Sequence, residues 1–590
     1  SREVRMPILN STLIIIVTFI PLFFLTGMEG RMLVPLGIAF IVALFASTIV
    51  ALTLTPVLCS YLLGKGGDDK MSREPIVART LKKYYQRALE WSLRHRREVL
   101  GGTIVLFVAA LITFFTLGRS FLPSFNEGSF TINVSTLPGI SLEESDNIGR
   151  RAEQLLLEVP EIKTVARKTG RAELDEHALG VNTSEIEAPF ELKDRSHAEV
   201  VADVRKKLSI LPGVNIEIGQ PISHRIDAML SGTQARIAIK LFGDDLNRMF
   251  MLGNQIKKNI STIDGVVDLN VEQQIERPQL KITPRREMLA RYGVTLSEFS
   301  EFIDVALAGE VVSQVYEGSR TFDLTVKVKD DERATASRIG DLMIDTQMGK
   351  VPLSTLAEIE SATGPNTINR ENVKRKIVIS ANVSDRDLRS VVDDIRERID
   401  ETITLPEGYF IEYGGQFESE AAASRTLSIV SLFSLLVVFL LLYNQFRSAS
   451  QSAVILLNLP LALIGGVFIL RFTTGEISIP AIIGFISLFG IATRNGMLLV
   501  SHYNTMLAEG HTLHDTVLHG SLDRLNPILM TALTSALALI PLALGGDLPG
   551  NEIQSPMAKV ILGGLITSTF LNAFVVPVVY WIMNRKKENR

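Results

Sequence analysis

The apolar segment PILNSTLIIIVTFIPLFFLTG, residues 7–27, is the best guide to the fold, because a second version of it occurs near the other end of the chain. Residues 527–546 read PILMTALTSALALIPLALGG, and the two prolines within each copy are 14 residues apart. A third proline follows at a matching distance, as Pro56 in the first copy and Pro577 in the second. Apolar segments that recur with matched prolines predict a duplicated unit of membrane helices.

Further apolar stretches flank both copies, and a bilayer is crossed by about 20 such residues. Eight stretches of the chain are long enough: 8–27, 33–63, 98–118, 425–444, 451–471, 478–504, 527–546 and 557–584. The second copy has one span, a charge-rich segment at 119–423 and then five spans, whereas the first copy has only its last two spans. We therefore expect the chain to be the C-terminal part of a protein of about 1,000 residues with twelve spans.

The composition excludes several classes of protein. Among 590 residues, 46% are hydrophobic and 21% are charged, which is too apolar for a wholly soluble protein. The net charge of −4 argues against a nucleic-acid partner. The single cysteine excludes an internal disulfide and a cysteine-based zinc site.

Basic residues set the expected orientation in the membrane. Residues 65–98 contain ten basic and five acidic residues, so they are expected on the cytoplasmic side, together with the basic tail 585–590. Residues 119–423 then lie on the outer side. Residues 76–97 have the pattern of an amphipathic helix on the inner membrane surface, with a solvated linker helix as the alternative.

Strand-like and helical patterns alternate in the external segment. TINVSTL (131–137), a helical pattern at 141–158, KTVARKTG, EAPFELK (187–193), a helix at 196–209 and VNIEIG follow in βαββαβ order. A second such module begins at IAIKLFG (237–243) and closes with YFIEYGG (409–415), around an inserted subdomain at 277–372.

The predicted fold is a polytopic α-helical membrane protein, with about eight transmembrane helices here, that carries an α+β domain of ferredoxin-like βαβ subdomains. The predicted domains are the last two helices of the first repeat (1–64), an amphipathic linker helix (65–97), the first helix of the second repeat (98–118), a first subdomain (119–235), a second subdomain (236–276 and 373–423) with its insertion (277–372), and five helices with a tail (424–590).

Motifs for enzymatic chemistry are missing from the sequence. It contains no P-loop, no HExxH and no GxSxG, so we predict neither an ATP-driven protein nor an enzyme, and no cofactor.

Arg494 is the strongest physical signal in the spans, because it lies near the middle of 478–504 in the motif GIATRNG. A central arginine costs about 2.5–3.5 kcal/mol to insert into a bilayer. It needs an acidic partner, and the spans of this chain contain none. We predict a role in an ion relay, with a structural ion pair as the alternative. Asn495 and Thr531 are further polar candidates, although each alone fits simple packing.

A cluster of oxygen and nitrogen donors marks the first external subdomain. The predicted metal ligands are Asp175, His177, Glu185, Glu187, His224 and Asp227. Carboxylate and imidazole suit zinc, cobalt or nickel better than copper(I). Acidic loops without a metal are the alternative.

Several motifs together resemble the resistance–nodulation–division (RND) exporters. They are PLALIGG (460–466), GIATRNGMLLV (490–500), RLNPILMT (524–531) and the repeated TPV/VPV span ends. FLPSFNEGSF (121–130), HRIDAMLSG (224–232) and GPNTINRENVKRKIVISANV (364–383) resemble the heavy-metal branch, the CusA/CzcA-like pumps.

The resemblance implies a homotrimeric proton antiporter in the inner membrane of a Gram-negative bacterium, with its large domain in the periplasm. It implies a periplasmic adaptor and an outer-membrane channel as partners, and a docking role for 277–372. The relay residues would be Arg494, Arg524, Thr531 and Asn495, facing acidic residues of the first repeat. The three methionines of the copper and silver pumps correspond to Asn133, Glu185 and Ala228, which disfavours copper(I) and silver(I).

We therefore expect proton-driven export of a divalent metal cation, of the zinc, cobalt or nickel type. One alternative is an RND pump for drugs or other organic molecules, which an aromatic-lined pocket would favour. Another is a non-exporting relative, either a translocation helper or a receptor.

Overall fold

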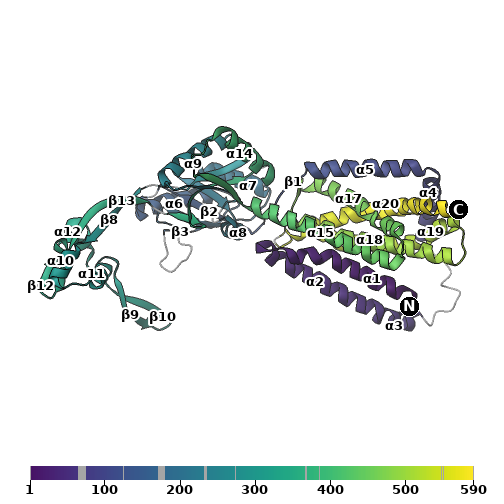
Figure 1. The fold of residues 1–590 in the computed structure, drawn as a ribbon, viewed down its shortest axis with the longest axis horizontal. Helices are drawn as coiled ribbons and strands as arrows, with labels where there is room; N and C mark the ends of the chain where they lie inside the picture. The colour runs from purple at the N-terminus through teal and green to yellow at the C-terminus, as the bar shows by residue number, and fades with distance from the viewer. Residues whose placement is uncertain are drawn as a thin grey trace.

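A computed structural model gives the fold of the chain. It describes residues 2–588 except 64–74, 124, 138, 171–179, 232–234, 273, 275, 366–367, 385, 547 and 549. The molecule is elongated, with a helical bundle at one end, two sheets with their helices in the middle, and a small module on a ribbon at the other end (Figure 1).

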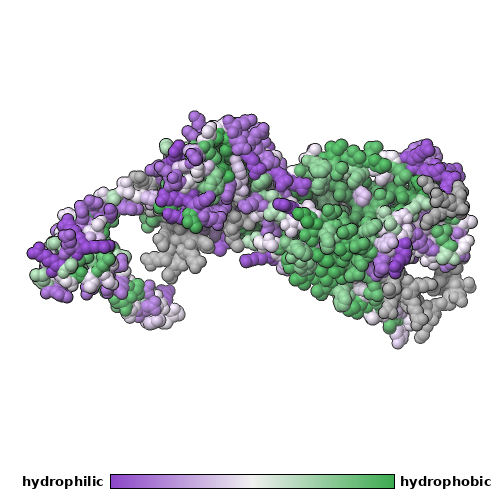
Figure 2. Space-filling view, viewed as in Figure 1, coloured by the Kyte–Doolittle hydropathy of each residue, from purple (hydrophilic) through white to green (hydrophobic). Residues whose placement is uncertain are grey.

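Long apolar helices form the bundle. Within the described residues, seven helices have the length and composition to cross a membrane: Gly27–Leu62 (α2, Gly27–Leu52, with α3, Leu54–Leu63), α5 (Arg96–Thr116), α15 (Gln416–Phe446), Ala449–Thr473 (α16, Ala449–Leu456, with α17, Asn458–Thr473), α18 (Ile479–Ala508), α19 (Leu513–Leu544) and α20 (Gln554–Glu588). Figure 2 shows their apolar outer surface, which includes exposed side chains such as Phe45, Phe115 and Leu432.

The predicted span 8–27 differs from the other seven. Its apolar helix, Leu9–Phe24, is shorter than a membrane-length helix. The α-helix α1 (Arg2–Phe19) gives way to a 3-10 turn, η1 (Ile20–Phe24), where Pro21 lacks the backbone N–H of a regular α-helix. Of the eight predicted spans, the structure therefore gives seven of membrane length.

The first sheet contains β2 (Ser129–Ser135), β3 (Ala166–Thr169), β4 (Thr183–Pro189) and β5 (Asn215–Gly219) in the antiparallel order β3-β4-β2-β5. Helices α6 (Leu142–Leu157) and α7 (His197–Leu208) contribute Leu156 and Val204 to a core with Ile132 and Ile186 of the sheet. The strand predicted at 187–193 begins earlier, at Thr183, so that prediction was wrong in its bounds. The alternation of Ser184, Ile186 and Ala188 with polar residues carries the strand signal instead.

The second sheet contains β6 (Ile237–Phe242), β7 (Val266–Val271), β14 (Asn369–Glu371), β15 (Lys374–Val383) and β16 (Phe410–Gly415). Its order is β14-β15-β6-β16, and β7 also pairs with β15. Helices α9 (Leu246–Ile260) and α14 (Leu388–Thr402) pack Ile256 and Ile395 into its core. The chain leaves and re-enters this sheet between β7 and β14, which is where the insertion begins and ends.

The insertion is held by an antiparallel ribbon of β8 (Glu276–Pro284) and β13 (Ala357–Pro365). Beyond the ribbon lie α10 (Arg286–Tyr292), α11 (Leu296–Ile303), η2 (Asp304–Ala308), the hairpin β9 (Glu310–Glu317) and β10 (Arg320–Val326), η3 (Asp330–Arg333), α12 (Ala336–Gly340), the hairpin β11 (Met343–Thr346) and β12 (Gly349–Pro352), and α13 (Leu353–Leu356). Leu289, Phe299, Leu353 and Leu356 form a separate core, so the module has its own source of stability.

Candidate functional site

A row of polar residues crosses the first sheet. Asn133 on β2 is paired in register with Glu185 on β4 and with Glu217 on β5, and Lys168 on β3 is paired with Glu185. Residues paired in register point to the same face of a sheet. The neighbouring residues Ile132 and Ile186 belong to the core under α6 and α7, so the polar row lies on the opposite face.

The carboxylates of this row have different partners. Lys168 Nζ lies 2.7 Å from Glu185 Oε1 in an ion pair whose carboxylate side chain is 16% exposed. Glu217 accepts hydrogen bonds from Asn270 and Ser380 of the second sheet. Burial raises the pKa of Glu217, and the nearby charge of Asp268 raises it further. The row is therefore exposed at its Lys168 end and enclosed at Glu217.

His224 covers this region from helix α8 (Pro221–Ser231) and is buried. Among the described residues, neither ring nitrogen has a hydrogen-bond partner. A Cβ at Gly219 would clash with the His224 ring, so only glycine admits the ring here. Burial lowers the pKa of His224 to about 4, although the charges of Glu185 and Asp268 act in the opposite direction. The imidazole is therefore neutral at neutral pH, the form that binds metals.

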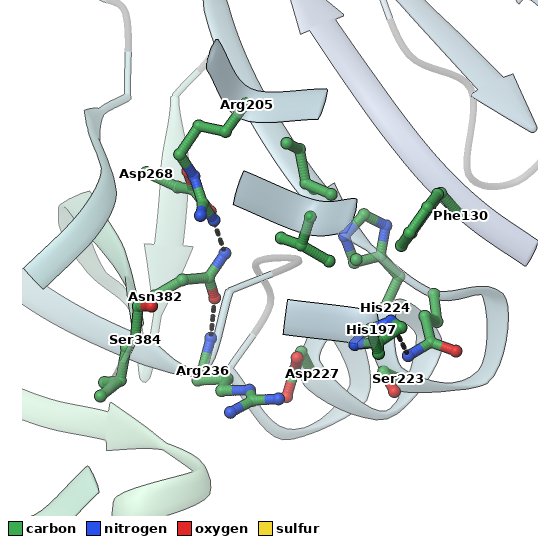
Figure 3. A pocket seen from close by; sticks show the side chains of 15 residues that line it. Phe130, His197, Arg205, Ser223, His224, Asp227, Arg236, Asp268, Asn382 and Ser384 are labelled. Carbon is green, nitrogen blue, oxygen red and sulfur yellow. Dashed lines mark hydrogen bonds and ion pairs between the residues drawn. The ribbon is translucent and has the colours of Figure 1, made fainter. Parts of the chain in front are cut away.

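A cavity of about 130 Å³ lies between the two sheets beside His224 (Figure 3). On one side of it, Arg205 Nε and Nη2 donate to the two oxygens of Asp268 at 2.8 and 2.9 Å. Asn382 Nδ2 donates to the same carboxylate at 3.1 Å. These contacts join α7 of the first sheet to β7 and β15 of the second.

Asp227 lines the same cavity and is buried. Its Oδ1 accepts a hydrogen bond of 2.7 Å from Gln416 Nε2, at the start of α15. Burial raises the pKa of Asp227 to about 6, although the charge of Arg236 and the Gln416 hydrogen bond lower it. The carboxyl group thus connects the sheets to the first residue of a membrane-length helix.

The predicted metal ligands are only partly brought together. Asp175 and His177 lie outside the described residues. Glu187 is exposed on β4, two residues from Glu185 and on the same face. Within the described ranges, no three His, Cys, Asp or Glu side chains are grouped as a metal site would require. Sequence reasoning missed Glu217, although its place between Ile216 and Ile218 in NIEIG marks it as the polar residue of an alternating strand.

The predicted relay residues lie on two neighbouring helices. Arg494 and Asn495 are on α18, where Asn495 is buried and Arg494 half-buried. Arg494 has no ion pair with any residue that the structure describes. Arg524 and Thr531 are on α19, and the Thr531 hydroxyl donates to the Pro527 and Ile528 carbonyls at 3.1 and 2.9 Å.

Helices α18 and α19 come into contact through small residues. Ala492 lies in one cluster with Ala532 and Ala536, so the two helices can approach closely. The face of α19 that carries Met530, Leu533 and Leu537 is exposed. The chain thus has the architecture of a polytopic membrane protein with an α+β domain, in which Asn495 is buried in the bundle and Thr531 is exposed.

The chain belongs to the AcrB/AcrD/AcrF family, whose model matches residues 1–584. This confirms the resemblance to RND exporters, a membrane-embedded family of transporters rather than enzymes. It is 34% identical over 602 residues to the cobalt-zinc-cadmium resistance protein CzcA of Cupriavidus metallidurans, covering 100% of this chain and 56% of CzcA. It is 32% identical to the nickel-cobalt-cadmium resistance protein NccA of Alcaligenes xylosoxydans xylosoxydans, covering 100% of this chain and 55% of NccA.

A crystal structure of a heavy metal efflux pump has the same fold. The TM-score is 0.82 at 28% identity, covering 99% of this chain and 58% of the pump. The chain therefore has an RND-pump fold and spans a little more than half the length of the relatives that it matches.

Proposed function

We propose that this chain is part of a pump that exports divalent heavy-metal cations, of the zinc, cobalt or nickel type, across the inner membrane at the expense of a proton gradient. The observation that supports this proposal is the partly buried row of Asn133, Glu185 and Glu217 beside the buried His224. The chain is also related over its whole length to cobalt, zinc, cadmium and nickel resistance proteins.

The donors of this region favour divalent cations. Carboxylate and amide oxygens and a neutral imidazole suit zinc, cobalt and nickel, whereas copper(I) and silver(I) prefer sulfur. The row contains no sulfur atom. No three such donors are grouped among the described residues, so we propose Glu185 and His224 as the first ligands, with Glu217, Asp175, His177, Glu187 and Asp227 as further candidates along the path. Lys168 forms an ion pair with Glu185, so an arriving cation has to displace the lysine ammonium group from the carboxylate.

The size of the cavity also favours a small cargo. Its volume is about 130 Å³. Pockets for drug-sized molecules measure about 300–1,000 Å³. Export of organic molecules, the principal alternative, would need a larger space or a site elsewhere.

We assign the coupling of transport to the proton gradient to residues of the helical bundle. An arginine without a carboxylate partner in the described residues needs an anion on neighbouring helices, and protonation of that anion would release Arg494. Arg524, Asn495 and Thr531 are assigned to the same relay. Each cycle of pairing and release would shift α18 against its neighbours and transmit movement towards the sheets.

The arrangement of the chain supports a tripartite assembly. We assign the two sheets to porter subdomains in the periplasm and the module at 277–372 to docking. The assembly would be a homotrimer with a periplasmic adaptor and an outer-membrane channel. The separate core and ribbon attachment of the module support this role, because they present a folded surface away from the membrane.

A susceptibility panel tests the proposed transport. The complete gene and its adaptor are expressed in an efflux-deficient Gram-negative host, which is challenged with zinc, cobalt, nickel, copper, silver and drugs. We expect protection against zinc, cobalt or nickel, lost in Arg494→Ala. Arg471→Ala, at an exposed span end, is the matched control and should retain protection. Protection against drugs alone, or against copper and silver alone, would overturn the divalent-cation assignment.

Binding of Co²⁺ by the purified protein, followed by its visible absorption, tests the ligands without transport. Each of Glu185→Gln and His224→Gln should weaken binding at least about tenfold, because even the loss of an outer-shell partner of a ligand costs about that much. Glu407→Gln, at an exposed loop position, is the control. Lys168→Gln should strengthen binding, because no ammonium group then competes for Glu185. Unchanged affinity in both ligand variants would place the cation elsewhere.

A further inference from the structure

Helix α4 (Ile76–Arg94) lies at the end of the bundle away from the sheets (Figure 1). One stripe of α4 is packed against the bundle. Tyr85 and Leu89 are buried with Leu518 and Leu525 of α19, and the Tyr85 hydroxyl donates to the Ala573 carbonyl of α20 at 2.6 Å. This docking fixes which side chains of α4 point outwards.

A second stripe of α4 is apolar and exposed. Val77, Leu81, Tyr84 and Trp91 follow one another at helical spacings of four, three and seven residues, and they are 43–78% exposed. Water-facing helices do not usually carry such a stripe, whereas Tyr and Trp are enriched where a membrane meets water.

A third stripe is basic. Lys83, Arg87 and Arg94 are exposed at spacings of four and seven residues, about a quarter of a turn from the apolar stripe. The apolar stripe therefore lies between the buried stripe and the basic one. None of the three basic residues forms an ion pair with a residue that the structure describes. Figure 2 shows hydrophilic surface at this end of the apolar bundle.

We propose that α4 is a binding site for anionic phospholipids. Val77, Leu81, Tyr84 and Trp91 enter the acyl boundary, while Lys83, Arg87 and Arg94 bind the phosphate of the headgroup. The order of the three stripes around α4 supports the assignment of lipid contacts. The buried stripe holds α4 on the bundle, the apolar stripe lies next to it at the depth of the acyl boundary, and the unpaired cations lie farther out at headgroup depth.

The corner between α4 and α5 provides a reporter. The Trp91 ring stacks on His95 with ring centres 4.7 Å apart, at the residue where α4 ends and α5 begins. The chain has two tryptophans, so Trp581→Phe leaves Trp91 as the only indole. Its fluorescence then reports on the lipids at α4.

The test uses the Trp581→Phe chain in phosphatidylcholine nanodiscs that contain a minor fraction of brominated phosphatidylglycerol or, separately, brominated phosphatidylcholine. Each Lys or Arg near an anionic surface favours contact by about fivefold. We therefore expect brominated phosphatidylglycerol to quench Trp91 at least about twofold more strongly at low salt, and the difference to shrink at high salt.

The triple variant K83Q/R87Q/R94Q should lose this preference and keep quenching by both lipids. The matched control K206Q/K258Q/R291Q removes three exposed basic residues of the sheets and the insertion, and should keep the preference. Equal quenching of Trp91 by the two lipids, in the chain that keeps Lys83, Arg87 and Arg94, would overturn headgroup binding. Absence of quenching by either lipid would mean that protein covers α4 and would overturn the proposal altogether. Neither result depends on metal export.

Discussion

At the scale of single residues, the buried groups between the sheets are governed by their immediate surroundings. Asp227 is 4% exposed, and its pKa is raised from 3.8 to about 6, chiefly by burial. A carboxyl whose pKa is higher in the folded state favours folding when it is protonated. Its contribution is therefore fully present below pH 3.8 and is lost as the pH rises through about 6. The difference amounts to about 3 kcal/mol.

We expect Asp227→Asn to remove this pH dependence, because the amide does not ionise and can keep the Gln416 contact. The unfolding temperature of the variant should exceed that of the parent at pH 8, and the difference should shrink towards pH 4. Thermal unfolding of detergent-solubilised protein across this range measures it. Asp393→Asn, at an exposed position of α14, is the control and should run parallel to the parent. A parallel profile for Asp227→Asn would contradict the assignment.

At the scale of elements, the ion pair of Arg205 on α7 with Asp268 on β7 joins the two sheets. The Asp268 side chain is 4% exposed, so its carboxylate is stabilised by Arg205 and Asn382 rather than by water. Removing one partner of a buried pair costs more than removing both, because an unpaired charge stays behind.

We expect Arg205→Gln to destabilise the junction by about 2–3 kcal/mol, somewhat below the cost for a fully buried pair because Arg205 is partly exposed. Arg205→Gln/Asp268→Asn should be less destabilised than Arg205→Gln alone. Amide hydrogen exchange of β5 and β7 measures the loss locally. Arg150→Gln, which breaks the exposed pair with Asp146, is the control, with an expected cost below about 0.5 kcal/mol. A double variant as unstable as the single one would contradict this account.

At the scale of the whole molecule, the separate cores predict separable functions. The insertion has its own core and leaves the second sheet as a two-stranded ribbon. The pair of ribbon residues at its base, where β8 begins and β13 ends, is Glu276 and Pro365. Paired strand residues are about 5 Å apart, so a short turn can close the gap.

We expect replacement of residues 277–364 by a Gly-Ser turn to abolish metal protection in cells, because the proposed docking surface is lost. Co²⁺ binding by the purified deletion variant should stay within about threefold of the parent, since the first sheet has an independent core. Loss of binding as well as protection would show that the insertion supports the site directly.

Much of the fold could be predicted because the responsible forces are local. Hydrophobic length indicates the spans, the alternation in TINVSTL indicates strand β2, and the short apolar run IAIKLFG indicates strand β6. The bounds of β4 were missed because the apolar positions alone did not extend the strand to the polar Thr183 and Ser184, which are placed by pairing with β2. The span at 8–27 was predicted, but its change to a 3-10 turn at Ile20 was not, because the matching Pro541 lies inside a continuous helix and a proline at this position does not by itself end one.

The candidate site was less predictable than the fold. Glu185 and His224 were recognised as donors, but the capture of Glu185 by Lys168 depends on strand register, which sequence spacing does not reveal. Glu217 was missed because its burial arises where β5 meets the second sheet. These are contacts between residues far apart in the chain.

Composition and spacing along the chain were enough to indicate seven of the eight predicted membrane-length helices, the family and the isolated charge of Arg494, whereas the repeat stays a prediction. The folded chain was needed to show which donors meet in the row of Asn133, Glu185 and Glu217, that His224 is neutral beside it, and which stripe of α4 is left exposed. Register, burial and helix docking set the surroundings of a side chain, and these surroundings are built by residues distant in sequence.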